Sequence, residues 1–136
     1  MHLCRRGLFM RGSGLMGSFP LNRAHVEAHV SIVSPGIFAL GHRSADGSKF
    51  TIARVGRSDA DVNRRLREYI GRYSHFKFGY SPSSADAFEK ECALYHQLNP
   101  RDNKAHPLRP AGTIWKCPMC EIFDIFPLRA NRRLAG

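Results

Sequence analysis

Three arginines close together in the middle of the sequence, Arg64, Arg65 and Arg67, are well suited to binding phosphate. The residues before them predict a strand that ends in a tight turn at Gly56, and Ser58 is a favoured residue to cap the helix that follows. A glycine turn that opens a basic helix often binds anions, because backbone N–H groups and the positive end of the helix point the same way. The pattern therefore indicates an anion-binding segment, although many basic helices are only solvated surfaces.

A carboxylate among apolar residues marks a second segment, the helix expected over residues 85–98. At helical spacing, Glu91 shares a face with three apolar residues, which are Ala87, Leu94 and Leu98. A carboxylate on an apolar face is costly unless it is paired with a base or holds a metal ion. We therefore expect Glu91 to face Arg65 across a shallow cleft, with both helices packed against the same sheet.

Cysteines and histidines in the last third of the sequence have the spacing of metal ligands. Cys92 and His96 lie one helical turn apart, and Cys117 and Cys120 form a Cys-x-x-Cys motif. Two thiols from this motif with a cysteine and a histidine from a helix make a donor set that tetrahedral zinc prefers. His106 is a second candidate for the histidine position, and the sequence does not decide between the two. The alternative is a pair of buried thiols beside an unrelated surface turn.

The composition indicates one basic domain. The chain has 136 residues, of which 43% are hydrophobic, and its formal charge is +10 with a pI near 10.1. Such an excess of positive charge predicts attraction to a polyanion, most simply nucleic acid. The sequence contains no apolar run of 18 residues, so we expect no membrane span. Four unevenly spaced cysteines are too few for a disulfide scaffold, which favours a cytoplasmic location.

Apolar and alternating runs predict three strands, at residues 36–41, 50–55 and 75–80. A turn signal at Asp46-Gly47 joins the first two strands as an antiparallel hairpin. With the two expected helices, these strands predict an α+β fold. It consists of a small three-stranded antiparallel sheet flanked by helices, followed by a C-terminal extension that carries the Cys-x-x-Cys motif.

Four parts of the sequence differ in composition. Residues 1–30 are expected to be a basic, disordered leader, because the segment lacks the periodic apolar pattern of a core element. Residues 31–104 contain the predicted strands and helices and form the domain. Residues 105–128 form the extension with the expected zinc motif, and residues 129–136 are a basic tail.

The hairpin and the arginine helix resemble the two-part signature of the GIY-YIG nuclease family. The run Gly36-Ile37-Phe38 stands where the family has the first half of its signature, and Arg54-Val55-Gly56 stands where it has the second half. Arg65-Leu66 is similar to the catalytic arginine that precedes a leucine in the family.

A separate motif on the second helix strengthens the resemblance. In the GIY-YIG family a helix glutamate is followed twelve residues later by an asparagine, with a proline between them. Glu91, Pro100 and Asn103 reproduce this order and spacing. The resemblance covers residues 33–104 and implies a GIY-YIG-like fold for them.

The resemblance implies a metal-dependent endonuclease that hydrolyses DNA phosphodiester bonds. It assigns Glu91 to a divalent ion, either Mg²⁺ or Mn²⁺, and Arg65 to the charge that develops in the transition state. Asn103 is expected to support the substrate or its own loop by hydrogen bonding. The remaining basic residues are expected to contact backbone phosphates, namely Arg57, Arg64 and Arg67.

The general base is missing from its family position. Both signature tyrosines are replaced, by Phe38 and Arg54. Phenylalanine cannot transfer a proton, and arginine is a poor base because it stays protonated. Tyr69, on the same helix face as Arg65, and His42, at the end of the first strand, are the candidates to replace it.

Three functions are compatible with these patterns. The first is a nuclease, and the second is a catalytically inactive nucleic-acid-binding module on the same fold. The third is a zinc-stabilised interaction domain whose positive charge only steers it towards acidic partners. DNA is the expected partner in the first two, and the sequence identifies no protein partner.

Overall fold

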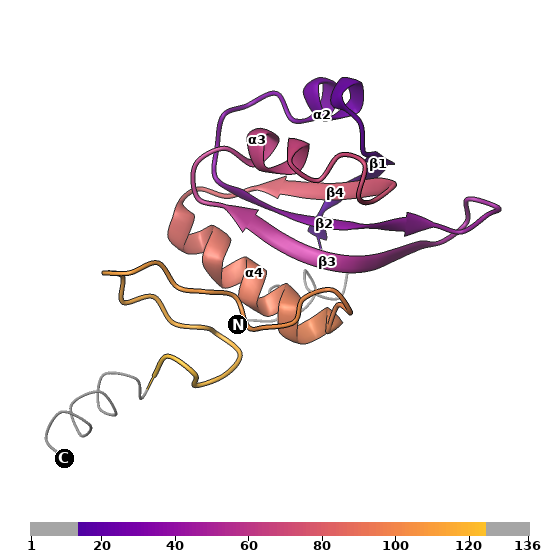
Figure 1. Cartoon of the computed structure of the whole chain (residues 1–136). Helices are drawn as coiled ribbons and strands as arrows, with labels where there is room; N and C mark the ends of the chain where they lie inside the picture. Colours follow the sequence, from indigo (N-terminus) through magenta and orange to yellow (C-terminus); the bar gives the residue numbers. More distant parts are fainter. Residues whose placement is uncertain (1–13, 125–136) are drawn as a thin grey trace, which may run out of the picture.

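Four antiparallel strands form one sheet in the computed structural model, which describes residues 14–124. The strand order across the sheet is β1-β4-β2-β3 (Figure 1). The strands are β1 (Met16–Pro20), β2 (Gly36–Arg43), β3 (Phe50–Ser58) and β4 (His75–Tyr80). The basic tail expected at residues 129–136 and the first part of the expected leader lie outside the described residues.

Within the described residues, three helices cover the two faces of this sheet (Figure 1). The short helices α2 (Arg23–His29) and α3 (Val62–Arg67) lie on one face, and α4 (Ser84–Leu98) lies on the other. The side chain of Ser83 caps α4 by accepting from the Asp86 N–H, and Asn99, whose φ is 47°, caps its C-terminal end. None of the helices described within residues 14–124 is long and apolar enough to cross a membrane.

Alternation along the strands divides the core into two layers. On the side of α2 and α3, Phe38 and Leu40 of β2 pack with Phe76 and Phe78 of β4. The alternate residues of β2, Ile37 and Ala39, point to the opposite face and pack with apolar side chains of α4. Both faces of the sheet are therefore buried, and the two helical layers can approach each other only around its outer strands.

The α+β class and the antiparallel sheet are confirmed, but the expected number of strands is one too low. The extra strand, β1, pairs antiparallel with β4 and comes from the expected leader. Three apolar residues after it are buried in the core, which are Leu21, Val26 and Val30. A disordered leader that reaches residue 30 is therefore wrong for residues 16–30. The pattern was missed because β1 is short and α2 has only two turns.

The expected glycine turn at Gly56 is also wrong, because β3 continues through this residue to Ser58. The helix begins later than expected, and Asp61 caps it by accepting from the Arg64 N–H. Gly56 is required for a different reason. A Cβ atom there would lie 2.5 Å from Cζ of Phe38, whose ring covers the glycine. Gly36 is similarly confined, because a Cβ atom on it would lie 2.5 Å from the Gly79 carbonyl oxygen.

Candidate functional site

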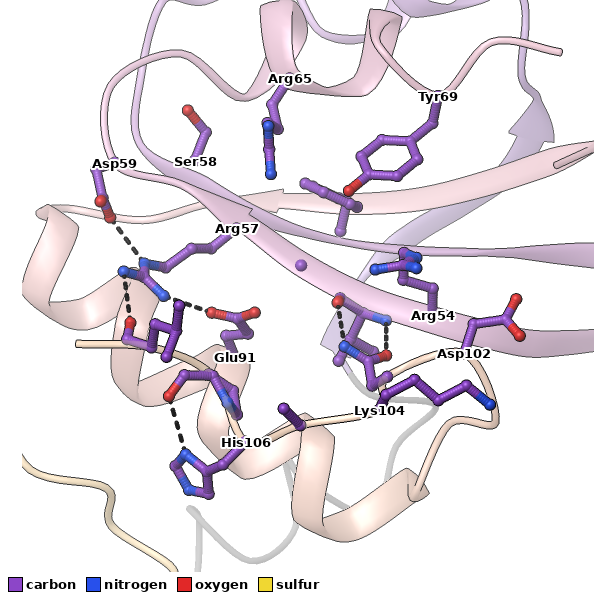
Figure 2. A pocket seen from close by; sticks show the side chains of 17 residues that line it. Arg54, Arg57, Ser58, Asp59, Arg65, Tyr69, Glu91, Asp102, Lys104 and His106 are labelled. Carbon is purple, nitrogen blue, oxygen red and sulfur yellow. Dashed lines mark hydrogen bonds and ion pairs between the residues drawn. The ribbon is translucent and has the colours of Figure 1, made fainter. Parts of the chain in front are cut away.

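A cavity of about 620 Å³ follows the outer strand β3. Arg65 and Tyr69 reach it from the α3 side of the sheet, whereas Glu91 and His106 reach it from the α4 side (Figure 2). The cavity thus lies where the two layers meet around the edge of the sheet. Its volume lies within the range of roughly 300–1,000 Å³ that is usual for small-molecule sites.

Glu91 forms its ion pair with Arg57, with 2.7 Å between Arg57 Nη1 and Glu91 Oε1. Arg65, which was expected to face Glu91 across a shallow cleft, lines the same cavity, but its ion pair is with Glu68. The reason is the alternation of side chains along β3, which directs Val55 and Arg57 to the face covered by α4. Arg65 belongs to a helix on the opposite face.

Arg57 is held by four contacts, so it is less available for the expected phosphate contact than an unpaired arginine would be. It donates from Nε to Asp59 at 2.8 Å and from Nη2 to the Leu108 carbonyl oxygen at 3.1 Å, besides its bond to Glu91. Its guanidinium also lies over the Phe88 ring. Burial lowers the pKa of Arg57, but its bonds to Asp59 and Glu91 outweigh that effect and raise it.

Burial also affects the pKa of Glu91, the other member of the ion pair. Burial raises the pKa of Glu91, and the hydrogen bond and charge of Arg57 oppose this increase. The carboxylate is therefore stabilised in its ionised form mainly by Arg57. A metal ion bound at Glu91 would therefore share the carboxylate with the guanidinium of Arg57.

Arg65 is held much more weakly than Arg57. Its only ion pair within the described part of the chain is with Glu68, and both side chains are about half exposed, at 46% and 50%. Exposed pairs of this kind are worth about 0.2–1 kcal/mol, so a phosphate can displace Glu68 easily. Arg65 is thus the arginine of the cavity that is best able to bind a new anion.

Tyr69 is buried between an apolar residue and three cations. Its ring lies 5.7 Å from the Phe38 ring, and its hydroxyl points towards the middle of the cavity (Figure 2). Three guanidinium groups lie within 5.8 Å of the Tyr69 ring, those of Arg54, Arg65 and Arg72. Tyr69 therefore presents a hydroxyl group next to the position where Phe38 lacks one.

Arg54, which replaces the second signature tyrosine, belongs to a hydrogen-bonded chain. Its Nε donates to the Tyr73 hydroxyl at 3.2 Å, and that hydroxyl donates to Asp102 at 2.7 Å. The bond from Tyr73 lowers the pKa of Asp102. The bond to Tyr73 raises the pKa of Arg54, which keeps this guanidinium charged at the cavity.

Asn103 supports the loop in which it lies, as one of its two expected roles requires. Its side-chain amide accepts from the Val55 N–H at 2.8 Å and donates to the Val55 carbonyl oxygen at 3.0 Å. These are the contacts that a neighbouring strand would make at the edge of β3. The amide is therefore committed to the backbone of β3.

Three of the residues that were expected to act as the base or to contact phosphate lie away from the cavity. His42 is near Ser74 and Tyr73 at the far end of β2, so the structure does not bring this candidate base to the other residues. Arg64 lines a smaller hollow beside Glu68, and Arg67 donates to the side chain of Asn63.

A group of two histidines and two cysteines could bind a metal ion such as zinc. Its members are His96, His106, Cys117 and Cys120, and their ligand atoms all lie within 4.8 Å of one another. Both candidate histidines thus belong to the group. Among the described residues, no group of this kind is built from carboxylates, so the structure gives no support for the expected Mg²⁺ or Mn²⁺.

Cys92, which was expected to be a ligand, is not a member of this group. Its side chain is fully buried with Phe88 and Cys117 in a small apolar cluster under α4. Burial raises the pKa of the Cys92 thiol, so it stays protonated. The expectation failed because His106, from the following loop, occupies the position that Cys92 was expected to fill.

Several residues of the cavity were missed by sequence reasoning. Lys104 and Asp102 flank Asn103 and line the cavity, and Tyr73 joins Asp102 to Arg54. Proximity to Asn103 was the one signal that could have pointed to the first two. The face of the sheet to which the Arg57 side chain points could have been predicted from the alternation of side chains along the whole of β3.

Comparisons with models of protein families, with curated proteins and with solved structures gave no match for this chain.

Proposed function

We propose that this protein is a metal-dependent endonuclease of the GIY-YIG type, which hydrolyses DNA phosphodiester bonds in the cavity along β3. One observation carries the proposal. Arg65 of α3 and Tyr69 of the turn after it lie on one face of the sheet and Glu91 of α4 on the other, yet all three line a single cavity. They supply a cation for phosphate, a hydroxyl that can orient a water molecule and a carboxylate that could hold a metal ion, each of which phosphodiester hydrolysis can use.

Arg65 binds the scissile phosphate in this proposal. Its planar guanidinium can form two parallel hydrogen bonds to phosphate oxygens, which a lysine cannot do. Its exposed pair with Glu68 is cheap to break, so the substrate recruits it without disturbing the fold. Lys104 lies on the opposite side of the cavity and adds positive charge there (Figure 2).

Tyr69 is assigned to the attacking water. Its hydroxyl points into the cavity beside Phe38, so it can hydrogen-bond a water molecule next to the phosphate (Figure 2). His42 is too far along β2 to share this role, because it lies outside the lining of the cavity.

Glu91 is the residue that would hold a divalent ion. Mg²⁺ is commonly bound by one or two carboxylates together with phosphates of the substrate, and a buried carboxylate at a phosphate site suits this requirement. Oε1 of Glu91 already accepts from Arg57, which leaves Oε2 for the ion. A bound ion would polarise the phosphate and stabilise the leaving oxygen.

A second candidate function is binding of nucleic acid without cleavage. Two observations favour it: neither signature position carries a hydroxyl, and the charge of Glu91 is already balanced by Arg57. In this case the same cavity binds a backbone phosphate through Arg65, and no hydrolysis follows.

The deciding experiment is cleavage of supercoiled plasmid and of branched DNA with Mg²⁺ or Mn²⁺. We expect wild type to cleave and Arg65→Ala to lose roughly 100-fold or more in rate, as when one transition-state donor is removed. Tyr69→Phe and Glu91→Gln should also abolish most cleavage. Arg64→Ala is the matched control, because it removes a neighbouring arginine that lies outside the cavity.

The outcomes separate the candidate functions. Equal losses in Arg65→Ala and Arg64→Ala would contradict the assignment of the cavity. A wild-type protein that binds DNA without cutting any substrate would support the binding module instead. Phe38→Tyr is informative in that case, because cleavage gained by this variant would show that only the hydroxyl is missing. Thermal unfolding of every variant checks that it is folded.

A further inference from the structure

The two-histidine, two-cysteine group joins three segments that are separate in the chain. His96 belongs to the last turn of α4, His106 to the loop after it, and Cys117 and Cys120 to the Cys-x-x-Cys turn. In tetrahedral zinc sites, neighbouring ligand atoms are about 3.3–3.8 Å apart, given bonds of about 2.0–2.3 Å. The observed limit of 4.8 Å is close to this spacing.

The hydrogen bonds around the group prepare it for a metal. His106 Nδ1 lies 2.9 Å from the Pro107 carbonyl oxygen, which can only accept, so Nδ1 carries the proton (Figure 2). The lone pair is then on His106 Nε2, which lies 3.5 Å from Cys120 Sγ. The Met119 N–H donates to Cys117 Sγ at 3.3 Å, a contact that favours a thiolate ligand.

Asn103 fixes the start of this loop to β3 and Arg57 holds the Leu108 carbonyl oxygen, but few apolar contacts hold the rest of the segment in place. Residues 99–124 contain no helix or strand, and four of their large apolar side chains are at least half exposed: Leu108, Ile114, Met119 and Ile122. The apolar contacts that remain are mainly those of Trp115 and Phe123 with Phe88 of α4. A segment with so small a core needs a further cross-link to adopt one conformation.

The same segment forms one wall of the cavity. His106, Pro107 and Leu108 all line it, and the Leu108 carbonyl oxygen accepts from Arg57. His106 therefore belongs to both the possible metal site and the cavity wall. Any constraint on His106 also fixes the two residues that follow it.

We propose that one Zn²⁺ ion, bound by His96, His106, Cys117 and Cys120, fastens the loop to α4 and so builds the cavity wall at residues 106–108. The ion has a structural role, because four protein ligands leave no open coordination position. It is separate from the divalent ion proposed at Glu91. The inference depends on the geometry of the loop and not on whether the protein cleaves DNA.

Metal content tests the site directly. The full chain, purified under reducing conditions without chelator, should contain close to one zinc per molecule. Replacing the zinc with Co²⁺ should give the absorption of a tetrahedral site with thiolate ligands. Cys120→Ser should lose the metal, whereas Cys92→Ala should keep it, because Cys92 lies outside the group.

Trp115 tests the effect on the loop, because it is the only tryptophan of the chain and lies within the segment. Removing zinc with a strong chelator should shift the emission of Trp115. Hydrogen exchange should speed up at residues 105–109, while the pairing of β2 with β3 keeps its protection. Adding zinc back should reverse both changes.

Several results would overturn the proposal. One is wild-type protein without zinc, or with Cys117 and Cys120 joined in a disulfide under reducing conditions. Another is a Cys120→Ser variant that keeps stoichiometric zinc. If zinc leaves and returns without changing Trp115 emission or exchange at residues 105–109, the ion does not build the cavity wall.

Discussion

At the scale of single residues, exposure decides which arginine is structural and which is available to a ligand. The side chains of Arg57 and Glu91 are 12% and 10% exposed, so breaking their pair from one side leaves a buried charge. That loss typically costs about 3–5 kcal/mol. The pair of Arg65 with Glu68 is exposed and worth less than about 1 kcal/mol. The two arginines therefore have different roles despite equal charge.

The amide of Asn103 gives a prediction at the same scale. In Asn103→Ala, the N–H and carbonyl group of Val55 both lose their partner at the edge of β3. We expect the free energy of unfolding to fall by about 1–3 kcal/mol, as when buried polar groups are left unsatisfied. Chemical denaturation measures this change. Lys104→Ala, at the exposed neighbouring position, should leave stability within about 0.5 kcal/mol of wild type.

An unchanged stability in Asn103→Ala would contradict the edge-strand role. Asn103→Asp refines the test, because a carboxylate can accept from the Val55 N–H but cannot donate to its carbonyl oxygen. Its stability should therefore lie between those of wild type and Asn103→Ala.

At the scale of elements, the sequence predicted the parts whose patterns are local and long. The hairpin of β2 and β3, the strand β4 and the helix α4 were expected within a few residues of their observed bounds. Each has a clear periodicity or turn signal. By contrast, β1 has only five residues and α2 only seven, and both depend on packing against distant elements. Such short elements have little pattern of their own.

For the candidate site, too, one part was predicted from the sequence and another was not. Arg65, Tyr69, Glu91 and Asn103 were predicted as site residues, and all four line the cavity. Their partners were not predicted, because a partner depends on which face of the sheet each element covers. The expectation that both helices pack against one sheet did not specify the face of each, so Arg57 was not recognised as the partner of Glu91.

The N-terminal elements give the second prediction, at the scale of elements. A chain that begins at Leu21 lacks β1, so the outer edge of β4 is exposed and Phe19 no longer packs on Phe76 and Phe78. We expect this chain to lose roughly 2 kcal/mol or more of stability, since burial of one large apolar side chain contributes about 1.5–3 kcal/mol. Thermal and chemical unfolding measure the loss.

A chain that begins at Gly14 is the matched comparison, because it keeps β1 and α2. The role of β1 is contradicted if the chains starting at Gly14 and at Leu21 unfold at the same midpoint. Insolubility of the shorter chain alone would agree with an exposed edge strand, which favours aggregation.

At the scale of the whole molecule, the sheet separates two layers, and its edge at β3 is where they meet. Residues from α3 and from the loop after α4 lie around this edge (Figure 2). The formal charge of +10 belongs to the whole chain and attracts a polyanion over a distance, whereas the cavity supplies the local contact. The two effects can be separated by the dependence of binding on salt.

The last prediction concerns this dependence. Each phosphate contact that releases a counterion contributes about −0.9 to the slope of log affinity against log salt for duplex DNA. We expect a slope of roughly −3 or steeper for wild type, equivalent to three or more phosphate contacts. Arg65→Ala should make the slope shallower by about one unit, because it removes one contact.

Arg23→Ala, at an exposed position on α2, is the matched control and should leave the slope unchanged. Equal changes in the two variants would mean that DNA is held by the net charge of the molecule and not by the cavity. A slope near zero for wild type would contradict nucleic acid as the partner altogether.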